Sequence, residues 1–257
     1  MAETRLQQRI SVVINTYNAQ KYLAKVLKTA QQFDEIVVCD MESTDETVNI
    51  ARQFGCKVVT FPKGDCKSAE PARTFAIQSA SSDWVLVADA DELIPVALRD
   101  FLYKFIANPG DIRGIYIPRK NYTMGRFMHS SYPDYQLRFF VREGTVWPPY
   151  VHTFPTVHGA LMHIDQKRED LAFDHLDDST WATVQRLNNY TENEVEKRLN
   201  TRITLAKMMF SPLNRFFKLY ILKGGFRYGI PGYVQAMRSA FYKFTVLCKI
   251  YERQKGL

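Results

Sequence analysis

The chain has 257 residues, of which 46% are apolar and 13% aromatic, so it can bury a sizeable core. This composition excludes the disordered and low-complexity classes of protein. The formal net charge is +7, but the segment 200–257 carries 11 Lys and Arg residues against one acid, whereas the first 199 residues carry a charge of −3. The basic excess therefore belongs to the C-terminal segment, and an anionic partner is expected there.

The cysteines show neither CxxC pairing nor a histidine at zinc-ligand spacing, so we predict neither a disulfide framework nor a structural metal site. They are Cys39, Cys56, Cys66 and Cys248. The N-terminal sequence MAETRLQQR lacks the apolar core of a signal peptide, and the chain has no run of 18 apolar residues. We therefore expect a cytoplasmic protein that does not span a membrane.

The first 110 residues alternate between short apolar runs and amphipathic stretches. The apolar runs are rich in Val and Ile, which is typical of buried strands in a parallel sheet; they cover 10–14, 35–39, 57–60 and 84–88. Helical patterns lie between them, over 19–31, 43–54 and 68–80. The alternation predicts a doubly wound α/β sheet, a fold that binds ligands beyond the carboxyl ends of its strands.

Beyond residue 111 the pattern changes. Residues 112–163 are irregular and strand-like, and after Ser179 the sequence is helical nearly to its end, with interruptions predicted at Pro212 and over 224–233. We therefore predict an α/β domain over 1–178, with one half at about 9–110 and another at about 111–178. A helical extension follows over 179–257.

Two carboxylates, Asp89 and Asp91, directly follow the apolar run 84–88. At the end of a strand they place hard oxygen ligands at the sheet edge, where a divalent ion can bridge to a diphosphate. The alternative is that both acids cap the following helix, since Pro95 lies close behind. A DxD motif alone leaves both interpretations open.

Asp40 follows the second apolar run, at the same predicted edge. A carboxylate there can accept a hydrogen bond from a base or a ribose. The alternative is that Ser43 and Thr44 cap the next helix while Asp40 belongs to the turn. Nothing in the sequence gives Asp40, Asp89 and Asp91 an evident partner, and a bound cation and nucleotide would relieve their repulsion.

Arg73 lies near the start of the predicted helix that precedes the DxD strand. Its guanidinium can pair with a phosphate or stack on a base. Alternatively, it bridges to Glu70 or Asp91.

The order and spacing of these motifs resemble the family-2 glycosyltransferases, which have the nucleotide-diphospho-sugar-binding GT-A fold. The matching segments are SVVINTYN at 11–18, VVCDMESTDET at 37–47, ARTFA at 72–76 and WVLVADADE at 84–92. A looser likeness to the bacterial lipopolysaccharide-core glucosyltransferase branch extends nearly to the C-terminus, through PDYQLRFFVREGTVWPPYVHT, RLNNYT and the segment 211–252. The resemblance implies a nucleotide-sugar-binding half over 9–110 and an acceptor half over 111–178.

The resemblance implies roles for several residues of the first half. Thr16, Tyr17 and Asn18 match the loop that lies against the nucleobase. Asp40 matches the acid that reads the uracil, and Arg73 matches the basic residue beside the nucleotide.

The resemblance also implies a metal site and a general base. Asp89 would approach the ribose and phosphate, and Asp91 would ligate Mg²⁺ or Mn²⁺, with Asp89 and His152 completing the candidate metal set. Asp134 matches the acid of the family's later motif, which acts as general base; the alternative is a loop or N-cap acid after Pro133. In the implied reaction an acceptor hydroxyl displaces the nucleoside diphosphate with inversion, a metal stabilises the leaving group and a carboxylate takes the proton.

Three features bear on these assignments. Met41-Glu42 stands where the family often has Asp-Gly, so the turn after Asp40 lacks its usual glycine. Thr153 follows Val151-His152 where the related branch commonly has a Glu that could serve as base. His158 and His175 are alternatives to His152 as metal or phosphate contacts, although a loop histidine is commonly a structural hydrogen bonder.

One apolar stripe recurs at steps of three and four near the C-terminus: Val234, Met237, Phe241, Phe244, Cys248 and Tyr251. Arg238, Lys243, Lys249 and Arg253 fall on other faces. A basic, aromatic, amphipathic helix is typical of the interface of an anionic bilayer. The alternative is that the stripe packs on the catalytic domain, and nucleic-acid binding is not expected because no recognised motif accompanies the charge.

Together these features predict an inverting, metal-dependent glycosyltransferase that moves a hexose, glucose foremost, from a UDP-linked donor to a cell-envelope glycan or lipid-linked acceptor. We expect it at the inner face of the cytoplasmic membrane as a peripheral protein. One alternative is a nucleotidyltransferase, which would be expected to have a glycine-rich loop that NTYNAQKY lacks. Another is a catalytically degenerate scaffold at the membrane.

Overall fold

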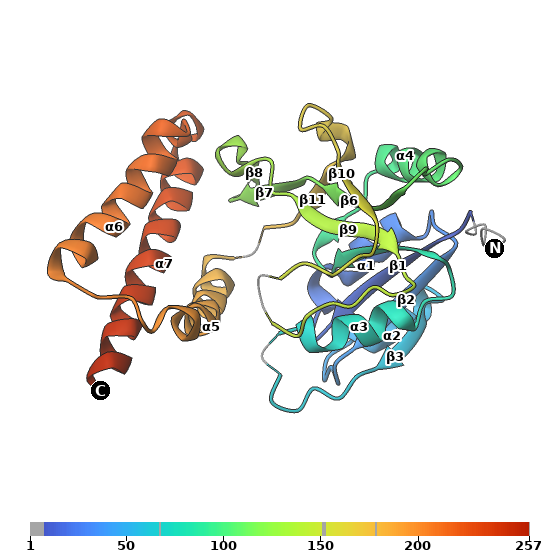
Figure 1. Cartoon of the computed structure of the whole chain (residues 1–257), viewed down its shortest axis with the longest axis horizontal. Coiled ribbons are helices and arrows are strands. Elements are labelled where there is room, and N and C mark those ends of the chain that lie inside the picture. The colour runs from blue at the N-terminus through green and yellow to red at the C-terminus, as the bar shows by residue number, and fades with distance from the viewer. Residues whose placement is uncertain (1–7, 67, 151–152, 178, 257) are drawn as a thin grey trace. The chain divides into compact units, whose positions relative to one another are not determined.

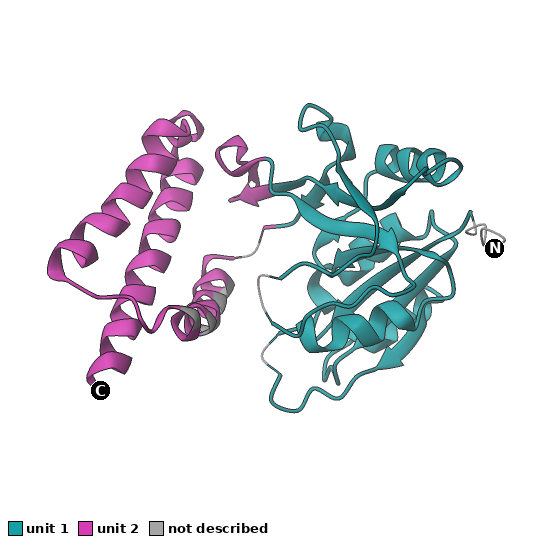
Figure 2. Ribbon diagram, in the orientation of Figure 1, with its two compact units in different colours: residues 1–120, 133–176 teal, residues 121–132, 177–257 magenta. Residues whose placement is uncertain are grey.

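The computed structural model describes residues 8–66, 68–150, 153–177 and 179–256 (Figure 1). The chain divides into two compact units (Figure 2). Unit 1 comprises Met1–Lys120 and Pro133–Leu176, and unit 2 comprises Asn121–Tyr132 and Asp177–Leu257. The sequence pattern puts the boundary after residue 178 and keeps 121–132 in the first domain; in the structure this segment belongs to unit 2.

Unit 1 is built on a seven-stranded mixed sheet with the strand order β10-β6-β9-β4-β1-β2-β3. The strands β1, β2, β3 and β4 are parallel, β9 runs antiparallel to both β4 and β6, and β10 is parallel to β6. Their bounds are β1 Ile10–Thr16, β2 Glu35–Asp40, β3 Lys57–Thr60, β4 Trp84–Asp89, β6 Ile112–Ile117, β9 Gln136–Val141 and β10 Ala160–His163. The predicted strands of the first half are confirmed.

Helices cover both faces of this sheet, because the strands are apolar on both sides. Ile10, Val12 and Ile14 of β1 share a buried cluster with residues of α1, α2 and α4, whereas Val13 lies in a second cluster with residues of α3. All residues of β1 are buried, as expected for a central strand of an α/β sheet. The helix bounds are α1 Gln20–Ala30, α2 Thr47–Gln53, α3 Glu70–Gln78 and α4 Val96–Ile106.

A short second pairing in unit 1 lies beyond the end of β4. Strand β5, Glu92–Leu93, pairs antiparallel with β11, Phe173–His175, which comes about eighty residues later in the chain. A 3₁₀ turn, Glu169–Leu171, precedes β11 in unit 1, and another, His129–Ser131, belongs to unit 2. The β5–β11 pairing matters for the site because it brings a distant segment to the DxD motif.

Unit 2 is mainly helical. A short hairpin joins β7, Arg119–Thr123, to β8, Arg126–Phe127. The helices α5, α6 and α7 follow, and Figure 1 shows α6 and α7 lying side by side. Their bounds are α5 Thr180–Arg198, α6 Leu205–Phe217, a π-helical turn Lys218–Leu222, a 3₁₀ turn Gly225–Tyr228 and α7 Ile230–Lys255. No helix of the described residues is long and apolar enough to cross a bilayer.

The predicted interruption at Pro212 is wrong, because α6 continues through this residue. Proline cannot donate the main-chain hydrogen bond, but α6 packs along α7 and tertiary contacts outweigh the loss. The break comes later, at the turn 224–229. There a Cβ on Gly232 would lie 1.9 Å from the carbonyl oxygen of Gly225, so only glycine permits this approach of α7 to the preceding turn.

Candidate active site

Asp89, at the carboxyl end of β4, is surrounded by arginines. Its Oδ1 accepts a hydrogen bond from Arg73 Nη2 at 2.8 Å, its Oδ2 accepts one from Arg138, and Arg119 Nη1 lies 3.9 Å from Oδ2. Burial alone would raise the pKa of Asp89, but the charges of Arg138, Arg73 and Arg119 outweigh burial and hold this pKa far below its usual range. Asp89 is therefore ionised, and 28% of its side chain stays accessible.

Arg119 connects Asp89 to Asp134. Its Nε and Nη2 donate to Asp134 Oδ2 at 2.9 and 2.6 Å, and its Nη1 donates to Glu92 Oε1 at 3.0 Å. Glu92 is fully buried and accepts a second hydrogen bond from the backbone N–H of Asp89 at 2.9 Å. Burial would lower the pKa of Arg119, but Glu92, Asp134 and Asp89 outweigh it and raise this pKa, so the guanidinium stays charged. With Arg73 and Arg138 included, three arginines balance the three carboxylates of Asp89, Glu92 and Asp134 in one ion-pair network.

Asp91 lies beside His175. The Oδ2 atom of Asp91 is 3.5 Å from Nε2 of His175, and the backbone N–H of Leu176 donates to the Asp91 carbonyl at 2.8 Å. Burial would lower the pKa of His175, but the hydrogen bond and charge of Asp91 outweigh burial and raise it. A carboxylate oxygen and an imidazole nitrogen at this separation are a donor pair that suits a divalent cation.

Asp40 is buried and is held by Thr16, where β1 passes into its following loop, and by Ser43 in the turn after β2. Its Oδ1 accepts from the hydroxyls of Thr16 and Ser43 at 2.8 and 2.6 Å, and its Oδ2 accepts from the Ser43 N–H at 2.8 Å. An ionised carboxylate has about four acceptor positions. Asp40 therefore retains capacity for one further donor.

Tyr17 and Asn18 follow Thr16 on this loop, and both are exposed. The Asn18 Oδ1 accepts from the Thr44 N–H at 2.9 Å and the Asn18 N–H donates to Ser43, so Asn18 ties the β1 loop to the turn after β2. The ammonium of Lys63 lies 4.7 Å from the centre of the Tyr17 ring.

The turn after Asp40 contains a residue with a left-handed backbone conformation, although it has no glycine. Glu42 has a φ of 61°, in the left-handed region that glycine occupies at little cost. Its carboxylate accepts a hydrogen bond from the Lys63 N–H at 3.1 Å. Met41-Glu42 therefore stands in place of Asp-Gly, and Glu42 still has the left-handed backbone conformation.

Several interpretations of single residues are corrected by these contacts. Helix α4 has Pro95 at its N-cap and no side-chain capping bond, so Asp89 and Asp91 do not cap it. The N-cap of α2 is Glu46, so Ser43 and Thr44 do not cap that helix. Arg73 bridges to Asp89 rather than to Glu70 or Asp91. The view that Asp89 lacks a partner is also wrong.

Arg73 and Arg138 keep buried N–H groups that no described protein atom satisfies. These are the Nε and Nη1 groups of each guanidinium. The side-chain amide of Asn15 on β1 is also buried and has no hydrogen-bond partner among the described residues. The guanidinium carbon of Arg73 lies 4.5 Å from the centre of the Trp147 ring, which is also buried. Unsatisfied buried donors are costly, and a bound anion would satisfy them.

The candidate histidines lie in different surroundings, and Thr153 makes a local hydrogen bond. His152 lies outside the described residues, His158 is exposed, and His175 is the histidine that meets the DxD motif. The hydroxyl of Thr153 donates to the Tyr150 carbonyl at 2.6 Å. Among the described residues no group of three or more His, Cys, Asp or Glu side chains could hold a metal alone, so a cation at Asp91 and His175 would need ligands beyond this pair.

Comparisons with known proteins fit this site. The family model for glycosyl transferase family 2 matches residues 11–171, which is more than half of the chain. The chain belongs to glycosyl transferase family 2. It is a glycosyltransferase with a GT-A fold and a helical C-terminal region.

Relatives of this family-2 glycosyltransferase align over nearly its whole length. The lipopolysaccharide core biosynthesis glycosyltransferase LpsC of Rhizobium meliloti (strain 1021) is 27% identical over 262 residues, which covers 95% of this chain and 92% of the relative. An uncharacterized glycosyltransferase of Rickettsia felis is 26% identical over 269 residues and covers 95% and 90%. The mannosyltransferase PcManGT from Pyrobaculum calidifontis, solved in complex with GDP-Man and Mn²⁺, is similar with a TM-score of 0.57 at 15% identity over 96% of this chain and 88% of that one. At this identity the likeness shows the fold alone.

Sequence reasoning did not assign Arg119, Arg138 or Glu92 to the site of this family-2 enzyme. A signal for Arg138 exists, because it interrupts the apolar strand QLRFFV, and a charge buried in a sheet requires an acidic partner. Glu92 directly follows the DxD motif, but its complete burial depends on β11. No local pattern identifies Arg119.

Proposed function

We propose that this glycosyltransferase moves a hexose, glucose foremost, from a UDP-linked donor to a lipopolysaccharide-core glycan or another lipid-linked acceptor, with inversion at the anomeric carbon. The observation that carries the proposal is the network in which Arg119 contacts Asp134 on one side and lies beside Asp89 on the other. It puts a candidate base and candidate donor-binding groups in one site. The name of the LpsC relative supports the acceptor class.

The donor nucleotide is proposed to lie along the ends of β1 and β2. Asp40 has acceptor capacity for the uracil N–H, and the exposed ring of Tyr17 offers a stacking surface beside the loop residues Thr16 and Asn18. The unsatisfied N–H groups of Arg73 and Arg138 are suitable donors to a diphosphate or to ribose hydroxyls. Asp89 keeps both guanidiniums charged and in place.

Asp91 and His175 are proposed as the protein ligands of Mg²⁺ or Mn²⁺. Their facing oxygen and nitrogen atoms support this assignment, and the diphosphate would supply further oxygen ligands. Asp89 is the less suitable ligand of the DxD pair because Arg73 and Arg138 already occupy its oxygens. When bound, the cation offsets the charge that develops on the departing diphosphate.

Asp134 is proposed as the general base. Its Oδ2 is held by Arg119 and its Oδ1 accepts a hydrogen bond from Gln136 at 3.0 Å, while 30% of its side chain is accessible. These contacts fix the carboxylate and keep an accessible oxygen lone pair for the acceptor hydroxyl. The hydroxyl oxygen attacks the anomeric carbon, the bond to the diphosphate breaks, and the hydroxyl proton passes to Asp134.

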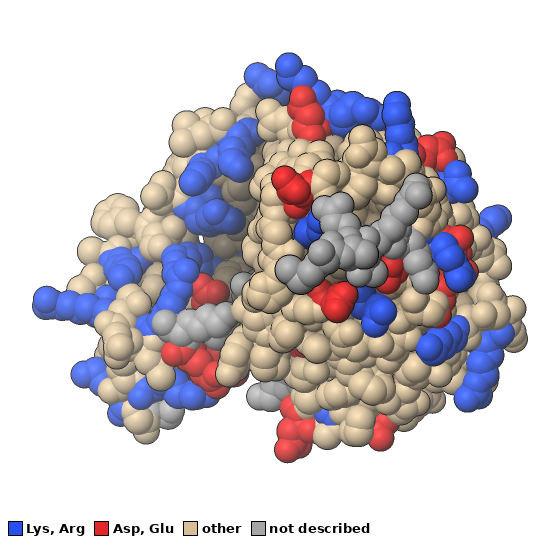
Figure 3. All heavy atoms as spheres, turned by 45° about the vertical axis from the view of Figure 1, so that its right-hand side comes forward, with Lys and Arg blue, Asp and Glu red and all other residues tan. Residues whose placement is uncertain are grey.

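We also propose that unit 2 associates with the anionic inner face of the cytoplasmic membrane, where a lipid-linked acceptor would be. The net charge of +10 over 200–257 supports this. Figure 3 shows Lys and Arg side chains over the whole face in view, with Asp and Glu side chains among them. The attraction would be electrostatic and would weaken with added salt.

A thermal-shift panel of nucleotide sugars, each with and without Mn²⁺, tests the donor assignment. We expect UDP-hexoses to raise the melting temperature most, because a ligand at about 100 times its dissociation constant adds about 2.7 kcal/mol. Transfer to a truncated core glycolipid, followed by NMR of the anomeric proton, tests inversion. Absence of binding to UDP in calorimetry, with and without Mn²⁺, would instead favour the membrane scaffold.

A further inference from the structure

Helix α6 carries large apolar side chains that the fold leaves uncovered. Leu205 is 75% exposed and Phe210 is 65% exposed, and Met209, Leu213 and Phe217 are more than half exposed as well. None of the helix's residues is buried. Scattered apolar side chains need no explanation, but a continuous set on one helix marks an interaction surface.

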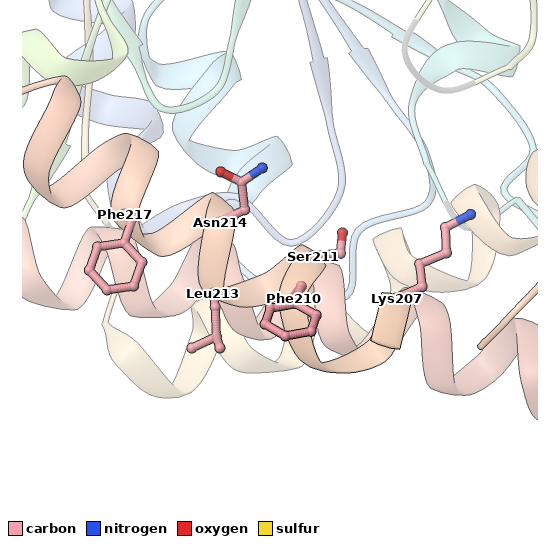
Figure 4. Close-up of a pocket in the computed structure, with 6 residues that line it drawn as sticks. All are labelled: Lys207, Phe210, Ser211, Leu213, Asn214 and Phe217. Atoms are coloured by element: carbon pink, nitrogen blue, oxygen red, sulfur yellow. The ribbon is translucent and has the colours of Figure 1, made fainter. Parts of the chain in front are cut away.

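These side chains share one face of α6. Leu205, Met209 and Leu213 follow steps of four, and Phe210, Leu213 and Phe217 follow steps of three and four. Figure 4 shows Phe210, Leu213 and Phe217 on one side of the helix and the polar ends of Lys207, Ser211 and Asn214 on the other. These six residues line an open hollow along the helix.

Other side chains of α6 pack within unit 2. Arg215 donates to the hydroxyl of Ser239 on α7 at 2.7 Å, and the ring of Phe216 packs against that of Tyr233 at 5.7 Å between centres. Beside these contacts, the apolar face formed by the five side chains above stays more than half exposed. It continues into the π-helical turn, where Leu222 is 80% exposed.

The charge around this face has one sign. From residue 200 to 251 the sequence contains no Asp or Glu. Lys207, Lys218 and Lys223 lie in or directly after α6 and form no ion pair with a described acidic side chain. On α7, by contrast, Lys249 and Arg253 pair with Glu192 of α5 at 2.7 and 2.6 Å. Lysines without an acidic partner among the described residues thus lie in and after α6, whereas Lys249 and Arg253 near the end of α7 are paired.

We propose that α6 lies in the interface of an anionic bilayer, with the face formed by Leu205, Met209, Phe210, Leu213 and Phe217 among the acyl chains, and with Lys207 and the lysines that follow the helix at the lipid phosphates. An exposed apolar face whose charged neighbours along the chain are all cations is the chemistry that such an interface recognises. This inference deepens the proposed membrane association and rests on it. It moves the contact from the stripe predicted on α7 to α6.

A second copy of this chain is a weaker occupant of the same face. In a two-fold dimer the same patch meets itself, so the lysines of both copies would come together with no acid of α6 to offset them. An anionic lipid surface relieves this charge instead of doubling it.

Vesicle co-sedimentation of the full chain tests the proposal, with neutral phosphatidylcholine vesicles and vesicles that contain about 30% phosphatidylglycerol. We expect binding to the anionic vesicles, and at least about tenfold weaker binding for the triple variant Phe210→Glu, Leu213→Glu, Phe217→Glu. The α7 pair Phe241→Glu, Phe244→Glu and the unit 1 variant Val96→Glu, which is also at an exposed apolar position, should stay within about twofold of the parent.

Three outcomes would overturn the assignment to α6. Binding by the α6 variant equal to that of the parent, or a loss of binding in the α7 pair alone, places the contact elsewhere. If light scattering without vesicles shows that the parent protein is a dimer and the α6 variant a monomer, a second copy of the chain is the occupant of this face. Circular dichroism verifies folding of each variant, and hydrolysis of UDP-sugar without vesicles should persist in the α6 variant. Vesicle binding without any hydrolysis by the parent protein would count against the proposed reaction and leave the membrane contact intact.

Discussion

The imidazole Nε2 of His175 lies 3.5 Å from the carboxylate Oδ2 of Asp91, although 84 positions separate the two residues in the chain. The antiparallel pairing of β5 with β11 produces this contact. It brings an imidazole nitrogen from the other half of unit 1 to the DxD motif, and it makes the proposed metal site testable with two separate substitutions.

The first prediction concerns these two ligands. Asp91→Ala should abolish Mn²⁺-dependent hydrolysis of a UDP-sugar, and His175→Ala should weaken Mn²⁺ binding in the presence of UDP by at least about tenfold, since each removes one protein ligand. Calorimetric titration of Mn²⁺ into the UDP-saturated protein measures the affinity. His158→Ala, an exposed histidine of the same unit, is the matched control and should bind Mn²⁺ as the parent does. Unchanged metal affinity in both ligand variants would remove this site from the proposal.

The second prediction concerns the general base. Asp134→Asn should lower kcat by about 10²–10⁴-fold, because the amide cannot take the proton of the acceptor hydroxyl. Binding of UDP should change little, since Asp134 is assigned to the acceptor. Asp170→Asn removes an exposed acid of unit 1 that pairs with Arg168, and it should leave kcat unchanged. Steady-state transfer assays measure kcat, and a loss of less than about threefold in Asp134→Asn would assign the base elsewhere.

The third prediction concerns the stability of unit 1. Asp89→Asn leaves the buried guanidiniums of Arg73 and Arg138 without their carboxylate, and we expect a loss of about 3 kcal/mol in the free energy of unfolding at pH 7. This is the lower part of the usual range because the Asp89 side chain is partly accessible. Urea denaturation measures it, with Asp100→Asn as an exposed control that should cost less than about 1 kcal/mol.

The difference in unfolding free energy between the parent and Asp89→Asn should also depend on pH, in a direction that the pKa of Asp89 fixes. The arginines hold the pKa of folded Asp89 far below the unfolded value of about 3.9. Its contribution is therefore complete above about pH 4 and is lost as the pH falls toward the folded-state value. The stability gap between parent and Asp89→Asn should stay constant from neutral pH to about pH 5 and narrow below pH 4. A gap that widens with acid would contradict the ion-pair assignment.

The fourth prediction concerns the left-handed residue Glu42. Glu42→Val should lower the free energy of unfolding by about 1–2 kcal/mol, because a β-branched residue is strained at a φ of 61°. Glu42→Gly should stay within about 1 kcal/mol of the parent, since relief of strain offsets the greater freedom of the unfolded chain. Thermal denaturation distinguishes the two variants. Equal destabilisation by Val and Gly would point to the hydrogen bond with Lys63 as the only contribution.

Local pattern was enough to predict the first half of the sheet. The Val- and Ile-rich runs of β1, β2 and β4 become buried parallel strands, since a strand covered on both faces must be apolar throughout. Pattern failed at Pro212, where packing of α6 on α7 overrides the low helix propensity of proline. It also did not place Asn121–Tyr132 in unit 2, because that depends on long-range contacts.

The amino-acid sequence by itself determined that Asp40, Asp89 and Asp91 follow buried strands, and that the positive charge gathers after residue 200. These are local properties of strands, motifs and composition. Only the tertiary structure decided which groups meet Asp89 and Asp91, because Arg119, Arg138 and His175 come from β7, β9 and β11, far away along the chain. It likewise decided that α6 exposes its apolar face while Glu192 compensates the end of α7. A charge is a property of one residue, but whether it is paired depends on which distant segments the fold packs around it.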